Sequence, residues 1–310
     1  MELPENLKEL YRHWEGHVGG ADGAETNNAE TYNGGDNKKL LRQIRWFINE
    51  RLEIWKKKTA GEKLPYTKDA ILSQYRFCNI FREFDRQTIE FHTLLNPLRD
   101  DFPLWLLNMF YCRMVARPET IRTAGLLSFD ATRNKELYAR LMSSPRPRYG
   151  TPYVFPVSVI QRSATPTREL FITNYLPHIM QSIAKEITTW KKESVYNGLE
   201  KIIPIFGYNL RFLWTEVLID VAYQFPQYVD LFARFPVGPG ALPTLKRFDA
   251  KKDPSELVRE LARIHLDTHL TYNRKLLRLS AENWEGVACE FRKYTSLAAG
   301  KGRKRIFRQR

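Results

Sequence analysis

The stretch of this sequence richest in side chains that could do chemistry is YRFCNIFREFDRQT, residues 75–88. At helical spacing it predicts a helix with one apolar and one polar face. The apolar face would hold Phe77, Ile80, Phe81, Phe84 and Thr88. The polar face would hold Tyr75, Asn79, Arg82 and Arg86, with Asp85 at its border.

The residue types on this polar face favour binding and catalysis over simple solvation. A solvated helix face is usually built from Lys and Glu in pairs one turn apart. Two arginine forks and an amide instead suit a phosphate group and the edge of a nucleobase. A buried polar cluster between helices is the alternative interpretation, and the side-chain types alone leave both open.

A second group of polar side chains lies near the C-terminus. The stretch ENWEGVACEFRKY, residues 282–294, carries Glu290, Arg292 and Lys293 on a helix predicted for 281–297. It is followed by a tail with six basic residues among the last 11 and no acidic residue. The DNA-contacting residues expected there are Lys301, Arg303, Lys304 and Arg305. A disordered tail that aids solubility is the alternative, but the charge of the chain favours the electrostatic contact.

Charge and composition narrow the class of protein. The 310 residues carry a net charge of +14, whereas residues 1–36 carry −6, so the remainder carries +20. This asymmetry predicts a polyanionic partner such as DNA. No apolar run approaches the length of a membrane span, and the acidic, amphipathic N-terminus does not resemble a signal peptide. The three widely spaced cysteines match no metal pattern and favour a reducing cytoplasm.

The elements that must position these residues are almost all helical, so we expect an all-α fold. Apolar periodicity predicts helices over residues 3–15, 38–58, 102–116, 207–225 and 253–272, with Pro118 and Asp130 beginning two more. The proline-rich stretch 144–168, which contains YVFPVSVI, predicts one short extended segment or hairpin, serving as a lid, a DNA contact or a plain crossing. The Gly- and Asn-rich residues 16–37 predict a flexible linker. The expected domains are therefore 1–37, a helical domain at 38–299 and a basic tail at 300–310.

The stretch FPVGPGALPTLK, residues 235–246, is similar to a helix-hairpin-helix turn. There Gly238 and Gly240 would let backbone N–H groups meet a DNA phosphate, with Lys246 close by. Pro239 and Pro243 depart from the usual hairpin pattern and remove donors, so a plain Pro/Gly turn is the alternative.

The order of these blocks resembles a known family over roughly residues 38–308. Its motifs are PYT at 65–67, the stretch 75–88, residues 282–294 and GKGRKR at 300–305. The family is related to helix-hairpin-helix DNA glycosylases and acts in thymine hypermodification of phage-type DNA. It includes the helical domains of 5-hydroxymethyluracil DNA kinases and the amino acid:DNA transferases, also named alpha-glutamyl/putrescinyl thymine pyrophosphorylases. The resemblance implies a two-lobed helical domain with DNA crossing its groove, in the cytoplasm of a phage-infected bacterium.

The resemblance also implies a reaction, in which an amine or amino acid replaces the phosphate or pyrophosphate on the 5-methylene of a modified thymine in double-stranded DNA. Leaving-group charge would be stabilised by Arg82 and Arg86, with Asp85 as base or arginine orienter. Tyr75, Arg76 and Asn79 would bind the substrate base, which we expect to be flipped from the duplex. Glu290, Arg292 and Lys293 would face them across the pocket.

The sequence lacks the motifs of several other enzyme classes. The sequence contains no GxxxxGK[ST] phosphate loop, no GxGxxG fingerprint and no zinc-deaminase signature. We therefore expect no organic cofactor and no metal, and a separate DNA kinase acting beforehand. His265 and His269 have a spacing that could hold a metal, but without an evident third ligand a structural pair is favoured. Two alternatives remain: a base-excision glycosylase of the same fold, using an acid such as Asp249 or Asp253, and a non-catalytic DNA-binding module.

Overall fold

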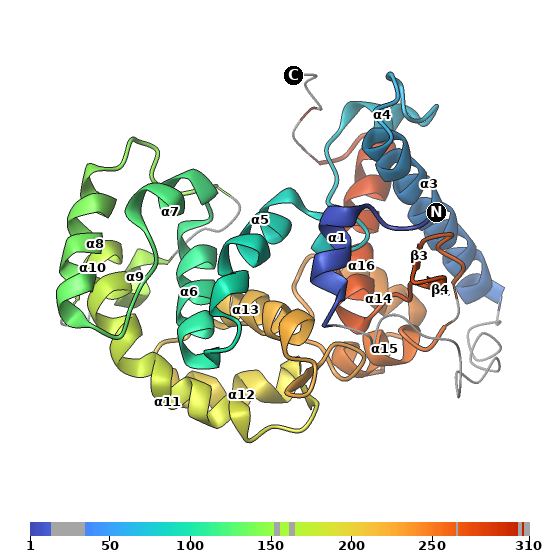
Figure 1. Cartoon of the computed structure of the whole chain (residues 1–310). Coiled ribbons are helices and arrows are strands. Elements are labelled where there is room, and N and C mark those ends of the chain that lie inside the picture. Colours follow the sequence, from blue (N-terminus) through green and yellow to red (C-terminus); the bar gives the residue numbers. More distant parts are fainter. Residues whose placement is uncertain (14–34, 152–155, 161–164, 265, 303–305, 307–310) are drawn as a thin grey trace. The chain divides into compact units, whose positions relative to one another are not determined.

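The computed structural model describes residues 1–13, 35–151, 156–160, 165–264, 266–302 and 306. Helices dominate and the strands are only two residues long, which confirms the all-α class (Figure 1). The described chain divides into two compact units, one formed by Met1–Asp85 with Leu231–Arg310 and the other by Arg86–Asp230. Most of the predicted linker, together with Arg303, Lys304 and Arg305 of the tail, lies outside the described residues.

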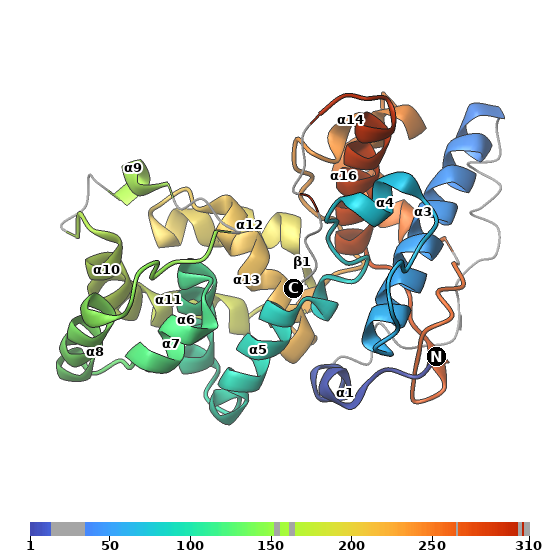
Figure 2. The same ribbon diagram turned by 90° about the horizontal axis from the view of Figure 1, so that it is seen from above.

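The first unit is organised around its C-terminal helix. Its helices are α1 (Glu5–Tyr11), α3 (Gly35–Thr59), α4 (Ala70–Gln74), the 3-10 turn η2 (Arg82–Phe84), α14 (Leu242–Phe248), α15 (Pro254–Leu261) and α16 (Ala281–Ala298). The strands β3 (Thr271–Tyr272) and β4 (Lys275–Leu276) pair antiparallel, with Thr271 opposite Leu276. Helices α3, α4, α14 and α15 all contact α16, which Figure 2 shows beside α14.

Helices α3 and α16 form where the sequence predicts them. The apolar stripe of α3, which includes Ile44, Phe47 and Ile48, is fully buried. Helix α16 begins with a capping box in which the Ser280 side chain accepts from the N–H of Asn283 and the Asn283 side chain accepts from the N–H of Ser280. Such a box satisfies backbone donors that the first helical turn leaves unpaired. Two predicted helices are therefore confirmed at the positions that carry the C-terminal motif and the basic segment 38–58.

The second unit is built on two central helices, α6 and α13. Its helices are α5 (Arg86–Leu95), η3 (Asn96–Leu98), α6 (Phe102–Val115), α7 (Pro118–Ala124), α8 (Ala131–Ser143), α9 (Val157–Ile160), α10 (Arg168–Leu170), the π-turn η4 (Phe171–Tyr175), α11 (Leu176–Thr188), α12 (Val195–Phe206) and α13 (Arg211–Gln224). Strand β1 (Glu193–Ser194) pairs in parallel with β2 (Val229–Asp230), with Glu193 opposite Val229. Between the central helices, the buried Asp220 carboxylate accepts two hydrogen bonds of 2.6 Å from Arg113 and lies 3.0 Å from His92 Nε2.

One predicted helix is too long, and one predicted extended stretch is partly helical. The helix expected over 253–272 ends at Leu261, because the chain turns and residues 271–272 pair with 275–276 as a small hairpin. In the stretch expected to be extended or a hairpin near 144–168, residues 144–151 form neither helix nor strand, whereas Val157–Ile160 is a short helix. Residues 152–155 and 161–164 of this stretch lie outside the described residues. None of the helices in the described part of the chain is both long and apolar enough to cross a membrane.

Candidate functional site

The helix predicted for residues 75–88 is not formed. Helix α4 ends at Gln74, and Tyr75 has extended dihedral angles of −111° and 147°. The chain then runs without helical structure to η2, and α5 begins only at Arg86. The prediction of one helical polar face holding Tyr75, Asn79, Arg82 and Arg86 is therefore wrong.

Long-range hydrogen bonds explain why this segment stays extended. The Arg51 guanidinium of α3 donates to the carbonyls of Phe77 (3.0 Å) and Cys78 (3.2 Å). The Glu290 carboxylate of α16 accepts the N–H of Cys78 at 3.1 Å. Backbone groups that a helix would pair internally are thus satisfied by side chains of two other helices. Exposure alternates accordingly, with Tyr75, Phe77 and Asn79 half-buried and the intervening Arg76 and Cys78 exposed.

Six residues of the first unit form what we name the Arg51 cluster. Its members are Arg51, Cys78, Asn79, Asp85, Glu290 and Lys293. Asn79 Nδ2 donates to Asp85 Oδ1 at 2.7 Å, and Lys293 Nζ lies 2.6 Å from Glu290 Oε1. The cluster brings four of the predicted site residues, Asn79, Asp85, Glu290 and Lys293, around one buried guanidinium.

The charges of the cluster shift the pKa values of its basic groups. Burial lowers the pKa of Arg51, and the nearby Glu290, Cys78 and Asp85 oppose that shift. Burial alone would lower the pKa of Lys293, but the hydrogen bond to Glu290 and the charges of Glu290, Cys289 and Cys78 together outweigh burial and raise that pKa above its ordinary value. Lys293 is therefore cationic, and it is ion-paired with Glu290 beside the exposed Cys78.

The remaining residues predicted for the central motif are spread over several settings. Arg82 is half-buried in η2, and Arg76 is exposed. Arg86 opens the second unit, where its guanidinium pairs with Glu90 at 2.6 Å. Arg292 is half-buried on α16, with its Nε atom buried and without a hydrogen-bond partner in the described part of the chain. The exposed Lys301 lies in a segment whose Ile306 forms an antiparallel bridge with Tyr75, so the tail passes the extended segment.

The predicted hairpin turn packs against α16. The N–H of Gly238 donates to Glu285 Oε1 at 3.1 Å. A Cβ atom at Gly240 would lie only 2.5 Å from Cys289 Sγ, so this position requires glycine for close packing. Lys246 is exposed at the end of α14. Contact with a DNA phosphate at this turn stays a prediction, and Glu285 already engages the Gly238 donor.

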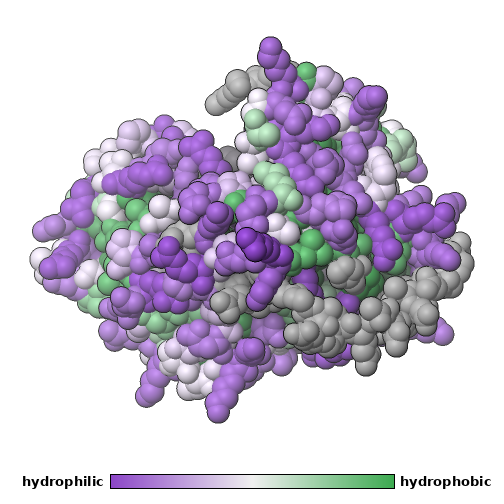
Figure 3. Space-filling model, turned by 45° about the vertical axis from the view of Figure 1, so that its right-hand side comes forward, coloured by the Kyte–Doolittle hydropathy of each residue, from purple (hydrophilic) through white to green (hydrophobic). Residues whose placement is uncertain are grey.

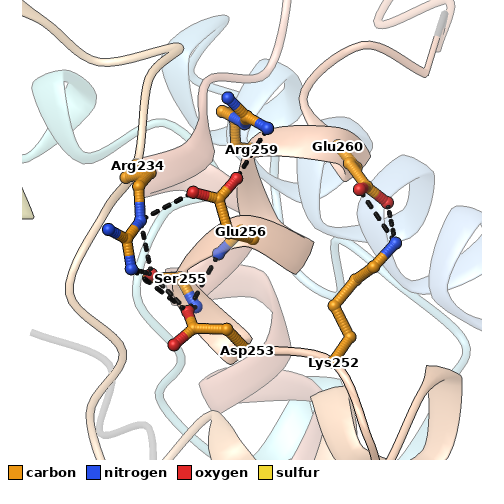
Figure 4. Close-up of polar contacts among 7 residues, drawn as sticks. All are labelled: Arg234, Lys252, Asp253, Ser255, Glu256, Arg259 and Glu260. Atoms are coloured by element: carbon orange, nitrogen blue, oxygen red, sulfur yellow. Dashed lines mark hydrogen bonds and ion pairs between the residues drawn. The ribbon is translucent and has the colours of Figure 1, made fainter.

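The two acids considered for glycosylase chemistry have structural partners, and Figure 4 shows those of Asp253. Asp253 caps α15, and Oδ1 lies 3.6 Å from Arg234, which also pairs with Glu256 at 2.7 Å. The hydrogen bond from Ser255 lowers the pKa of Asp253. Asp249 accepts the N–H groups of Lys251 and Lys252. These carboxylates stabilise the chain around α15.

The histidine pair has no metal-binding counterpart among the described residues. His265 lies outside them, and the exposed His269 is 3.0 Å from Asp267. No group of three potential metal ligands occurs in the part of the chain that the structure describes.

Sequence reasoning missed Arg51, the residue that organises the cluster. A sign of its role was present, because Arg51 is the one charged residue at a buried position of the α3 stripe between Ile48 and Leu52. A charge at an apolar position is buried only when it has partners, so it points to a polar cluster. The composition YRFCNIF also suits an extended segment, since aromatic and β-branched residues favour strands.

Comparison with known proteins identifies the family of this helical chain. It belongs to the family described as 5-hmdU DNA kinase, helical domain, whose model matches residues 38–304. It is similar to a 5-hmdU DNA kinase of Bacillus phage SP10, with 30% identity over 213 residues, covering 60% of this chain and 33% of the relative. The chain thus spans about a third of the length of that curated relative. No solved structure matches significantly.

Proposed function

We propose that this chain is a transferase of DNA thymine hypermodification. It replaces the phosphate or pyrophosphate on a 5-(pyro)phosphoryloxymethyl-uracil in DNA with an amine or amino acid. The family match over residues 38–304 carries this proposal, because it links the chain to phage DNA containing 5-hydroxymethyluracil derivatives. The 310-residue sequence contains no GxxxxGK[ST] stretch, and we therefore assign it a step other than phosphorylation, after a separate kinase.

The reaction needs three kinds of group, which the first unit contains. The amine nitrogen forms a bond to the 5-methylene carbon, the carbon–oxygen bond breaks, and the leaving phosphate takes the electron pair. Arg82 and the cationic Lys293 stabilise the charge of that leaving group. Asp85 takes the proton released by the amine, and its hydrogen bond from Asn79 holds the carboxylate in place. Tyr75 and Arg76 bind the DNA strand or the flipped base.

The decisive experiment is mass spectrometry of nucleosides after incubation with modified DNA. Duplexes carrying 5-phosphoryloxymethyl-uracil or its pyrophosphoryl form are mixed with the full chain and a defined pool of amines. We expect one amine adduct at the 5-methylene and release of phosphate or pyrophosphate. Release of free base with an abasic site would identify a glycosylase instead.

A non-catalytic DNA-binding module is the second candidate, and one observation favours it. In the Arg51 cluster, Glu290 is satisfied by Lys293 and the N–H of Cys78, and Asp85 by Asn79. Mutually satisfied pairs of this kind can also serve only to hold the chain. Tight binding of modified DNA without turnover of any amine would support the module.

A further inference from the structure

The outward face of α3 combines positive charge with an exposed indole. Residues 37–49 contain Lys38, Lys39, Arg42 and Arg45 and no acidic residue. None of these four cations pairs with a carboxylate in the part of the chain that the structure describes. Acids return only at Glu50, which accepts a hydrogen bond from Thr67, and Glu53, which pairs with Lys56. Among the described residues, the positive charge of the N-terminal half of this face is thus uncompensated, and it would attract an anion.

Trp46 directly follows these four cations on the helix and is 43% exposed. Trp105, Trp190, Trp214 and Trp284 are buried. The positions 39, 42 and 46 share one side of the helix, opposite the buried stripe of Ile44, Phe47 and Ile48. Helix α3 lies on the right of Figure 1, the side brought forward in Figure 3, where hydrophilic residues predominate. A large aromatic ring among cations is thus presented to solvent.

The indole of Trp46 packs against a second aromatic ring, that of Tyr294. The Tyr294 ring lies 5.7 Å from that of Trp46, at an interplanar angle of 49°. Its hydroxyl donates to Asp69 Oδ2 at 2.9 Å, and the ring also packs 5.4 Å from that of Phe47. The indole therefore rests on a fixed neighbour, which reduces the entropy that a ligand must remove on stacking.

We propose that this face of α3 binds single-stranded nucleic acid, with an unpaired base stacked on Trp46 and the adjacent phosphates held by Lys39 and Arg42. Aromatic side chains that stack on bases, next to cations that hold the backbone phosphates, bind unpaired bases without sequence preference. An apolar protein partner would find one exposed indole next to the exposed cations Lys38, Lys39 and Arg42, so the charge favours a nucleic acid. The inference rests on the proposed function for the identity of that strand as DNA, and it adds that the DNA beside the modified base is unpaired.

The test measures binding alone, with unmodified DNA. Fluorescence anisotropy compares a labelled single-stranded oligonucleotide with its duplex, for the full chain and its variants. Trp46→Ala should weaken single-strand binding by about 5- to 100-fold, the range for loss of one stacked base. Trp46→Phe should retain most of the affinity, because it keeps an aromatic face. Arg42→Gln should lower the salt slope by about 0.7, the value for one phosphate contact on a single strand.

A matched control uses the exposed aromatic of the second unit. Phe212 is 61% exposed, and Phe212→Ala should leave single-strand affinity unchanged. Circular dichroism and melting temperature confirm that each variant is folded. Wild-type affinity in Trp46→Ala, or an equal loss with duplex and single strand, would overturn the proposal, as would a wild-type chain that binds no oligonucleotide. Absence of amine transfer with the Trp46 effects intact would refute only the proposed function.

Discussion

Arg51 shows at the scale of single residues how the site is held. It is 8% exposed, and it bridges α3 to two successive carbonyls of the extended segment. Glu290 anchors the same segment from α16 through the N–H of Cys78. The Arg51 guanidinium and the Glu290 carboxylate together replace the hydrogen bonds that a helix would have supplied. They thereby fix where Asn79 and Asp85 lie.

Replacing Arg51 by methionine should therefore destabilise the first unit. The variant keeps most of the buried stem but leaves two carbonyls without their charged donor, at a cost of about 2–4 kcal/mol. Thermal or urea unfolding measures the loss. Arg42→Met on the exposed face of the same helix is the control, and should stay within about 0.5 kcal/mol of wild type. Equal stability of the two variants would show that the Arg51 bridge is not a structural support.

The catalytic assignment of Arg82 and Asp85 makes a separate prediction about rates. Arg82→Lys should be severely impaired in single-turnover amine transfer although its charge is kept, because an ammonium lacks the planar fork of a guanidinium. Asp85→Asn should also lose the chemical step, with DNA affinity and circular dichroism near wild type. Arg263→Lys, at an exposed position of the same unit, is the control. A folded Arg82→Lys variant with full activity would exclude Arg82 from leaving-group stabilisation.

At the scale of elements, the local spacing of apolar residues predicted the long helices correctly but predicted short segments wrongly. The apolar stripe of α3 extends over a 25-residue helix and that of α16 over 18 residues, so each predicts its own helix. The segment 75–88 has apolar residues at helical spacing as well, yet α4 ends at Gln74. Its backbone finds partners on α3 and α16 instead, and such tertiary bonds outweigh a helix propensity of a few tenths of a kcal/mol per residue.

Two glycines, Gly240 before α14 and Gly286 inside α16, should respond oppositely to alanine. Gly240→Ala places a Cβ 2.5 Å from Cys289 Sγ and should cost about 1–3 kcal/mol through overpacking. Gly286→Ala meets nothing within 4 Å inside α16 and should gain up to about 1 kcal/mol from helix propensity. Unfolding curves measure both. The double variant Gly240→Ala/Cys289→Ala should recover part of the loss, and no recovery would contradict the steric cause.

At the scale of the whole molecule, the fold joins distant parts of the chain. The first unit combines residues 1–85 with 231–310, and the second unit is inserted between them. The net charge of +14 is the sum of −6 over the acidic residues 1–36 and +20 over the rest of the chain. Within the first unit, Ile306 forms an antiparallel bridge with Tyr75.

Binding of duplex DNA should depend steeply on salt, with log K falling by about 0.9 for each phosphate contact. Deleting residues 300–310, which removes six basic side chains, should flatten that slope without altering transfer to a bound substrate. Affinities at several salt concentrations measure the slope. Substituting glutamine for Lys301, Arg303 and Lys304 should reproduce part of the effect. The control substitutes glutamine for the exposed Lys185, Lys191 and Lys192, and an equal effect there would show that only total charge matters.

The sequence by itself determined the all-α class, the positions of α3, α6, α13 and α16, the excess of basic residues and the motifs that place the chain in its family. These properties depend on residues within a few positions of one another or on composition. Only the tertiary structure decided that residues 75–81 are extended and that Arg51 lies at the centre of the cluster. The hydrogen bonds that hold this segment join residues 26, 27 and 212 positions apart in the sequence. The local spacing of apolar residues cannot predict partners at such separations.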